Sequence, residues 1–266
     1  MIREIADDAA APAAVRAVYD DIRQVLDTPV VNLVYRRLAG EGEEVLRQSW
    51  QLLRPAYLDG RIAHHAAPLA LIVQEPSNVS APALPAVLLP ELPTVRAVIA
   101  TYNANNARNL VAFSALLGLT PGRMDWPPLR ETTSRTDATT AISIPALPAF
   151  ATLPDSLQHS IHRLNLFGDT GEEGAPVASL YVHLSHWPDM LAHIERILQP
   201  LHEAGMLTRW RIETSDRAAS APLPDLRAPA ALRAALEPVL GALVRRTIPK
   251  MVPIGTLLSR VLTPHP

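Results

Sequence analysis

Two stretches of this 266-residue sequence resemble each other and decide the fold. The first, residues 30–60, reads VVNLVYRRLAGEGEEVLRQSWQLLRPAYLDG, and the second, residues 177–205, reads VASLYVHLSHWPDMLAHIERILQPLHEAG. With one small gap, the corresponding positions are Val31 with Val177, Tyr35 with Tyr181, Leu38 with Leu184, and Gly60 with Gly205. A weaker correspondence links residues 109–119 with residues 250–262. An internal duplication predicts a pseudo-dimer, in which two similar helical lobes of one chain hold a ligand site between them.

Helical periodicity extends over most of the chain. Apolar residues recur at three- and four-residue spacing, which is typical of amphipathic helices and predicts an all-α protein. The expected helices cover residues 15–26, 30–40, 45–59, 63–74, 94–119, 157–167, 176–186, 189–204, 229–246 and 248–262. Only RWRIETS, residues 209–215, shows the alternation of a short strand.

A change in composition separates the two repeats. Residues 121–150 are rich in proline, threonine and serine and lack periodicity, so we interpret them as a linker. Residues 1–120 then form the first helical repeat and residues 151–266 the second.

The overall composition limits the classes of function. With 48% hydrophobic and 19% charged residues, the chain is typical of a globular protein. A net charge of −2 gives no indication of a nucleic-acid partner or an anionic membrane surface, and no apolar run approaches the roughly 20 residues of a bilayer span. The N-terminal residues do not resemble a signal peptide. We therefore expect a soluble cytoplasmic protein, with a homodimer left open as its oligomeric state.

Several kinds of chemistry lack their sequence signals. The absence of cysteine excludes disulfides, thiol nucleophiles and cysteine metal sites. The dinucleotide-binding glycine pattern and the phosphate-binding loop are also missing, so we expect no cofactor.

Three phrases resemble those of the group I, non-stereospecific 2-haloacid dehalogenases, in that family's order. They are VYDDIRQVLDTPVVNLVYRRLA (18–39), TYNANNARNLVAFSALL (101–117) and SLYVHLSHWPDML (179–191). The resemblance implies an all-α duplicated pseudo-dimer, related to the helical fold of carboxymuconolactone decarboxylase and alkylhydroperoxidase-like proteins. It also implies a pocket in which a buried aspartate activates water to displace the halogen of a haloacid.

Carried over residue by residue, the resemblance places a pocket serine at Ser179 and the catalytic aspartate at the position of Leu180. The family's pocket asparagine, pocket tyrosine and two aromatic residues fall, in that order, on Asn106, Asn109, Val30 and Leu33. A leucine cannot accept a proton from water. The segments expected to line the pocket, residues 28–40, 92–124, 174–188 and 238–266, contain no Asp or Glu. The scaffold therefore matches the family, whereas its hydrolytic base does not.

Other polar residues provide candidates for binding and catalysis. Asn103, Asn105, Asn106 and Asn109 lie within two turns of one helix, and they form either a ligand-binding strip or a set of solvated amides. We choose His183, one turn beyond Leu180, and Tyr102 as candidate acid–base groups.

Neighbouring histidines and arginines raise two further possibilities. His183, His186 and His193 are spaced along the chain as metal ligands would be, but Pro188 interrupts their helix, so we expect no metal site. Arginines such as Arg36 would attract an anionic ligand.

Three hypotheses follow for the function. The first is a diverged enzyme with an apolar pocket, which acts on a small or medium organic acid by lyase, isomerase or cyclase chemistry. The second is a non-catalytic binding or accessory protein for such a ligand. The third is a hydrolytic dehalogenase whose base has moved.

Overall fold

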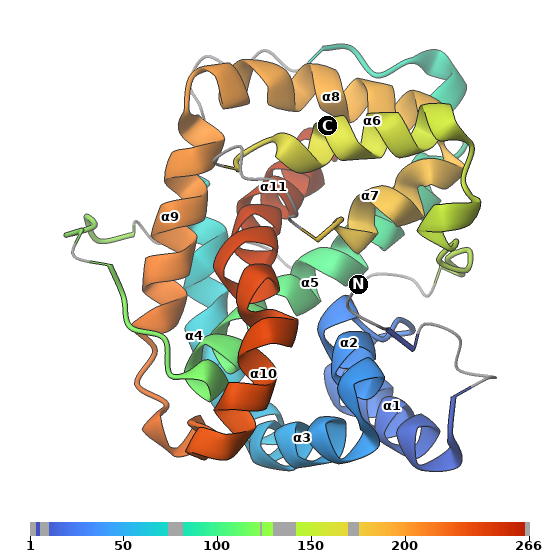
Figure 1. Ribbon diagram of the computed structural model, residues 1–266. Helices are drawn as coiled ribbons and strands as arrows, with labels where there is room; N and C mark the ends of the chain where they lie inside the picture. The colour runs from blue at the N-terminus through green and yellow to red at the C-terminus, as the bar shows by residue number, and fades with distance from the viewer. Residues whose placement is uncertain are drawn as a thin grey trace.

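The computed structural model describes residues 4–5, 11–73, 82–122, 124–129, 142–169 and 176–263. Within these ranges the structure is helical and contains no strand, which confirms the all-α prediction (Figure 1). The α-helices are α1 (Ala13–Leu26), α2 (Leu33–Glu41), α3 (Glu43–Leu58), α4 (Arg61–Ala66), α5 (Leu92–Leu117), α6 (Asp155–Leu166), α7 (Ser179–His183), α8 (Pro188–Glu203), α9 (Met206–Ala219), α10 (Ala230–Ala242) and α11 (Ile248–Val261). Short 3-10 turns are η1 (Ala67–Leu71), η2 (Ala86–Leu88), η3 (Phe150–Thr152), η4 (Leu184–His186) and η5 (Pro224–Leu226).

Residues 209–215 correct the one expectation of a strand, because they lie inside α9. The buried positions of this helix are Leu207, Trp210, Glu213, Thr214 and Ala218. Their three- and four-residue spacing is a helical period, and charged residues between them give a local alternation. The period over the whole helix predicts its structure better than the short window does.

The C-terminal helices α10 and α11 are joined without a loop. The connecting residues form η6 (Leu243–Thr247), which is a π-helical segment. The residues that flank it, Ala242 and Ile248, both have right-handed helical backbone angles. Helical structure therefore continues from Ala230 to Val261, with one wider turn in the middle. Single π turns of this kind are frequent at functional sites.

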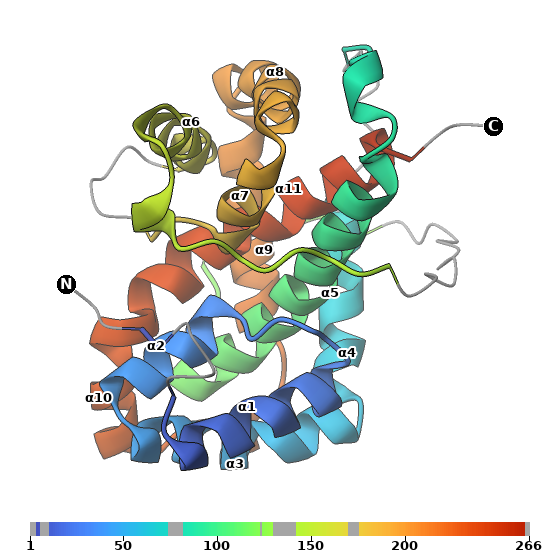
Figure 2. The same ribbon diagram turned by 90° about the vertical axis from the view of Figure 1, so that its right-hand side faces the viewer.

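Helix α5 runs through the middle of the molecule, and α11 lies against both α5 and α9 (Figures 1 and 2). Helix α10 packs on α2, α3 and α5, although its sequence belongs to the second repeat. One continuous hydrophobic core therefore includes residues of both repeats, among them Tyr19, Phe113, Leu184 and Leu258. The duplication, and its division at residues 120 and 151, stay predictions.

Part of the expected linker forms an ordered strap. Residues 123 and 130–141 lie outside the described residues, whereas residues 142–149 run as extended chain across α5 (Figure 2). We call residues 142–149 the strap. Its backbone carbonyls at Pro145 and Ala146 accept hydrogen bonds from the Nε2 atoms of His183 (2.8 Å) and His186 (2.9 Å). Two neighbouring histidines thus bind this extended segment to the helices below it.

None of the helices that the structure describes combines the length and the apolar composition that a membrane span requires.

Candidate functional site

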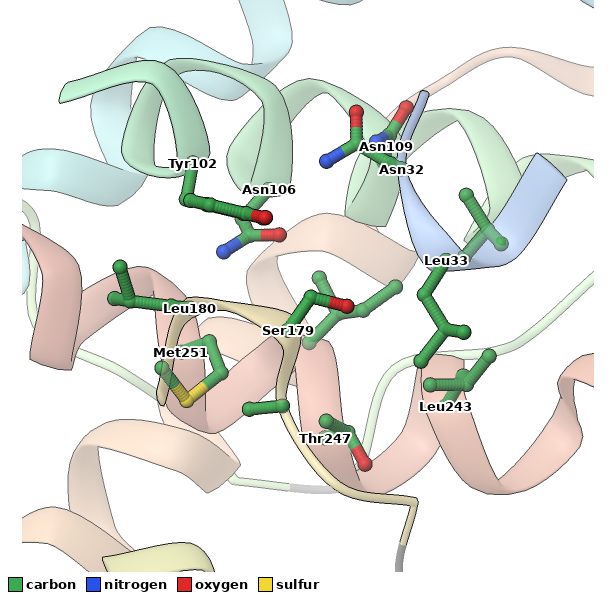
Figure 3. A pocket seen from close by; sticks show the side chains of 13 residues that line it. Asn32, Leu33, Tyr102, Asn106, Asn109, Ser179, Leu180, Leu243, Thr247 and Met251 are labelled. Carbon is green, nitrogen blue, oxygen red and sulfur yellow. The ribbon is translucent and has the colours of Figure 1, made fainter. Parts of the chain in front are cut away.

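A cavity of about 40 Å³ lies between the starts of α2 and α7, the middle of α5, and the η6–α11 segment (Figure 3). This volume holds on the order of three water molecules, so it suits a ligand of few atoms. The lining residues are Asn32, Leu33, Val34, Tyr102, Asn106, Asn109, Ala178, Ser179, Leu180, Leu243, Thr247, Ile248 and Met251.

Corresponding positions of the two repeats meet at this cavity. The alignment that pairs Val31 with Val177 also pairs residues 32–34 with residues 178–180, and all six residues line the cavity. Each triplet begins with an extended residue directly before a helix. The weaker correspondence of residues 109–119 with 250–262, extended towards the N-terminus, pairs two further sets of lining residues: Tyr102 with Leu243, and Asn106 with Thr247. The duplication itself stays a prediction.

The two repeats contribute walls of different polarity. The first repeat supplies most of the polar lining residues, Asn32, Tyr102, Asn106 and Asn109, together with the apolar Leu33 and Val34. The second supplies a mainly apolar wall, formed by Ala178, Leu180, Leu243, Ile248 and Met251, with Ser179 and Thr247 as its polar members. Figure 3 shows Tyr102 and Asn106 projecting from α5 toward Ser179. Such a cavity accommodates a molecule that has one polar and one apolar end.

The buried Tyr35 and the partly buried Tyr57 fix the amide of Asn109. Its Oδ1 atom lies 2.8 Å from the hydroxyl of Tyr57 and 3.0 Å from that of Tyr35, and both hydroxyls can donate to it. Burial raises the pKa of both tyrosines, which therefore stay protonated as donors. Because the amide oxygen is held in this way, the amide nitrogen of Asn109 is left as a donor for another partner.

Arg36 lies behind Ser179. Arg36 is 7% exposed, and its Nη2 atom donates a hydrogen bond to Ser179 Oγ at 3.1 Å. The serine oxygen acts as the acceptor in this bond, so its own hydrogen is available to a ligand in the cavity. The positive charge of Arg36 also favours an anionic ligand, although Glu4, whose Oε2 atom lies 4.0 Å from Nη2, balances part of it. Arg36 itself does not line the cavity.

The two candidate acid–base residues are in direct contact. The hydroxyl of Tyr102 lies 3.2 Å from Nδ1 of His183, whose Nε2 atom faces the carbonyl oxygen of Pro145 in the strap. A carbonyl only accepts, so Nε2 carries the proton and Nδ1 accepts the hydrogen bond of Tyr102. Burial lowers the pKa of His183, although the bond to Pro145 opposes this effect, and the imidazole is therefore neutral.

Tyr102 brings this pair to the cavity. Burial raises the pKa of Tyr102, with the charge of Arg36 as a smaller opposing effect. The side chain is a neutral phenol that lines the cavity, whereas His183 is fully buried behind it. The pair can exchange a proton with a molecule in the cavity through the tyrosine oxygen.

Of the other site residues expected from sequence, all but one line the cavity. Ser179, Leu180, Asn106, Asn109 and Leu33 all line the cavity, and Leu180 is buried there beside Ser179. Val30 is only partly buried and does not line it, because α2 begins three residues later at Leu33. No Asp or Glu is found among the lining residues in the described part of the chain.

The asparagine strip of α5 separates into two pairs. Asn106 and Asn109 reach the cavity, whereas Asn105 donates to the carbonyl of Thr101 and Asn103 Oδ1 lies 3.4 Å from the hydroxyl of Thr256. The two histidines that follow His183 in the sequence also have partners outside the cavity: His186 binds the strap, and His193 lies 3.5 Å from Arg196. Within the ranges that the structure covers, no group of three metal-binding side chains is present.

Sequence reasoning missed the other members of the lining, which are Asn32, Val34, Ala178, Leu243, Thr247, Ile248 and Met251. Asn32 carries a signal, since it stands directly before a helix as a capping residue but belongs to a matched triplet of the repeats. For Leu243 and Thr247, the only sequence signal is that the weak similarity between the two halves of the chain aligns them with Tyr102 and Asn106. The π-helical backbone that holds them has no clear sequence pattern.

The fold is similar to that of D-2-haloacid dehalogenases of known structure. A D-2-haloacid dehalogenase mutant in complex with D-2-CPA matches with a TM-score of 0.73 and 15% identity, over 99% of this chain and 96% of that one. The D-2-haloacid dehalogenase in complex with L-LA matches with a TM-score of 0.73 and 15% identity, over 99% and 97% of the two chains. No protein-family model and no curated protein matches the sequence.

At 15% identity, this similarity defines the fold and leaves the activity open. The expected resemblance to haloacid dehalogenases is confirmed at the level of the all-α scaffold. The replacement of a catalytic aspartate by Leu180 stays a prediction.

Proposed function

We propose that the chain is an enzyme that acts on a small organic acid by proton transfer through Tyr102 and His183. The observation that carries this proposal is the hydrogen bond between these two residues at a cavity whose lining contains no carboxylate. A reaction of the lyase, isomerase or cyclase class fits such a site, because it moves a proton without a carboxylate-activated water.

Polar groups from both walls would hold the carboxylate of the substrate. Ser179 and Asn109 each offer a hydrogen-bond donor, and the positive charge of Arg36 lies behind Ser179. The apolar part of the acid would rest against Leu180 and Met251. This orientation brings the substrate carbon atoms next to the hydroxyl of Tyr102.

The proton path is short and balanced. When Tyr102 accepts a proton from the substrate, its own hydroxyl proton passes to Nδ1 of His183, which becomes an imidazolium. In the reverse direction, the imidazolium returns this proton to Tyr102 as the tyrosine donates to the substrate. The carbonyl of Pro145 holds the imidazole ring in place during both steps. Positioned acid–base groups of this kind contribute about 10²–10⁴-fold to a rate.

The experiment follows a panel of small saturated, hydroxylated and unsaturated carboxylic acids by proton NMR in D₂O. It compares the native protein with Tyr102→Phe and His183→Gln, and Asn105→Ala serves as a control that alters a buried amide outside the cavity. We expect conversion or deuterium incorporation that falls by at least about 10²-fold in the first two variants and persists in the control. Conversion that is unchanged in Tyr102→Phe and in His183→Gln contradicts the proposal.

A binding or accessory protein is the second candidate. The observation in its favour is that both nitrogens of His183 already have partners, as in a purely structural histidine. Ligand binding without conversion of any acid in the panel would support this candidate.

Halide release tests the third hypothesis. Both enantiomers of 2-chloropropionate are supplied to the native protein and to Leu180→Asp. Release by the native protein would show that a hydrolytic base exists elsewhere. Release only by the variant would show a haloacid pocket that lacks its base.

A further inference from the structure

Helix α7, which carries Ser179 and Leu180 to the cavity wall, is too short to fix its own position. It has five residues, and isolated helices of this length are not stable in water. The residue before it, Ala178, has an extended backbone (φ −72°, ψ 124°). The position of Ser179 in the cavity therefore depends on the groups that hold residues 176–178.

Asn165, in the last turn of α6, binds this segment at two points. The backbone N–H of Ala178 donates to Asn165 Oδ1 at 3.1 Å, and Asn165 Nδ2 donates to the carbonyl of Pro176 at 3.3 Å. A backbone N–H only donates and a carbonyl only accepts, so both partners define the same orientation of the amide. The side chain of Asn165 thus takes the place that a neighbouring strand has beside an extended segment in a sheet.

Two further buried side chains complete this clamp. The hydroxyl of Thr247 donates to the same carbonyl of Pro176 at 3.2 Å, and Figure 3 shows the segment that leads to Ser179 passing beside Thr247. The ammonium of Lys250 donates to the backbone carbonyl of Asn165 itself. Asn165, Thr247 and Lys250 are all buried. Residues of α6, η6 and α11 therefore meet at the backbone that directly precedes the cavity wall.

A fixed backbone at Ala178 sets the direction of the next side chain. Ser179 is the first residue of α7, and its Oγ atom accepts the hydrogen bond of Arg36. Without Asn165, the buried N–H of Ala178 would lose its acceptor, which is costly enough for the segment to move toward another partner. A displacement of about 1 Å is sufficient to misalign a group that holds a ligand.

We propose that Asn165 is a positioning residue, which holds Ser179 at the cavity wall by fixing the backbone of residues 176–178. Asn165 itself does not line the cavity. This inference rests on the proposed function, in which Ser179 binds the carboxylate of the substrate. His183, at the other end of α7, is held separately by Tyr102 and the strap. Loss of Asn165 therefore weakens substrate binding more than it slows proton transfer.

Amide hydrogen exchange, followed by NMR, tests the clamp without any ligand. In Asn165→Ala, we expect the N–H of Ala178 to exchange at least about tenfold faster, because it loses one buried hydrogen bond. The rate is taken relative to that of Leu110, which is fully buried in α5, so that a change in global stability cancels. Asn165→Asp keeps an acceptor for Ala178 and should keep its protection. Asn165→Leu, which is similar in shape to asparagine, replaces Asn165→Ala if that variant does not fold.

Propionate tests the consequence for the cavity. By isothermal titration calorimetry, we expect it to bind about tenfold more weakly to Asn165→Ala than to the native protein. For an acid that the native protein converts, KM should rise by a similar factor, while kcat stays within about twofold. Asn105→Ala is the matched control, since it removes a buried amide that bonds only to its own helix. Its Ala178 exchange and its propionate affinity should equal those of the native protein.

The outcomes separate the two proposals. Exchange of Ala178 that is unchanged in Asn165→Ala overturns the positioning role and leaves the proposed function intact. Faster exchange without weaker propionate binding, or a fall in kcat without a rise in KM, has the same meaning. Failure of the native protein both to bind propionate and to convert any acid of the panel overturns both proposals.

Discussion

Tyr35 and Tyr181 occupy corresponding positions of the two similar stretches, and both side chains are fully buried. The hydroxyl of Tyr35 lies within hydrogen-bond distance of Tyr57 and Asn109. The hydroxyl of Tyr181 has no partner among the described residues. One position of the repeat therefore supports the site, whereas the other carries a buried polar group that stabilises nothing.

Replacing these tyrosines by phenylalanine should have opposite effects. Tyr181→Phe removes a hydroxyl that is buried without a partner, and we expect the free energy of unfolding to rise by about 1 kcal/mol. Tyr35→Phe takes a donor from the buried amide of Asn109, and we expect a loss of about 1 kcal/mol. Urea unfolding of both variants measures the two changes. A destabilised Tyr181→Phe would mean that its hydroxyl has a partner in solution.

At the scale of the elements, α11 carries a buried lysine, Lys250, whose effect on the free energy of unfolding depends on pH. The ammonium of Lys250 donates to the carbonyl of Asn165, and its Nζ atom lies 3.5 Å from Asp169 Oδ2. Burial lowers the pKa of Lys250 to about 8, although the charge of Asp169 opposes this shift. Asp169 also pairs with Arg246 at 2.9 Å, so this carboxylate keeps a partner if the lysine is removed.

The pH dependence follows from the lowered pKa. The unfolded chain binds a proton at Lys250 up to about pH 10.5, whereas the folded chain releases it near pH 8. The contribution of Lys250 to the free energy of unfolding is therefore most favourable above about pH 10.5, and it falls as the pH decreases toward 8. The native protein should gain on the order of 3 kcal/mol relative to Lys250→Met over this interval, as measured by urea unfolding at each pH. A difference that does not change with pH would contradict the burial of a charged lysine.

The sequence predicted the helices well where an amphipathic period extends over several turns. α1, α3 and α5 begin and end close to the expected residues. The prediction failed where a side chain bonds to the backbone and delays the start of a helix that the apolar spacing would place earlier. The hydroxyl of Thr28 bonds to the backbone of residue 30, where the chain bends, so α2 begins only at Leu33 and Val30 does not line the cavity.

The candidate site was predictable only in part. Positions near Leu180 and Asn106 were accessible through the family resemblance, and both line the cavity. Asn32 was not, because a capping asparagine is normally explained by its own helix. The joining of Tyr102 to His183 was also inaccessible, since residues 81 positions apart meet only in the folded chain.

At the scale of the whole molecule, the two predicted repeats share one core. Helix α11 packs against α5, and α10 packs against α2 and α3. The strap adds a further link, because its carbonyls bind two histidines of the second repeat. Each repeat on its own would therefore expose the apolar surface that it now buries against the other.

Fragments 1–120 and 151–266, produced separately, should each lack a cooperative unfolding transition, because the core they share is divided. The intact chain with an engineered protease site between residues 130 and 141 is the control. After cleavage, we expect its two pieces to remain associated and to keep native helix content. Circular dichroism with thermal unfolding measures all three samples. A separate fragment that unfolds cooperatively would show that one repeat is an independent domain.

The π-helical turn η6 has a consequence for how this cavity can change. Each residue of an α-helix turns the chain by about 100° around the helix axis. Loss of one residue between Leu243 and Thr247 would rotate α11 relative to α10 by about that angle, and Met251 would leave the cavity wall. The segment is an angular spacer between two helices that are otherwise continuous. Insertions and deletions at this point would exchange a whole row of side chains at once, which substitutions achieve only one residue at a time.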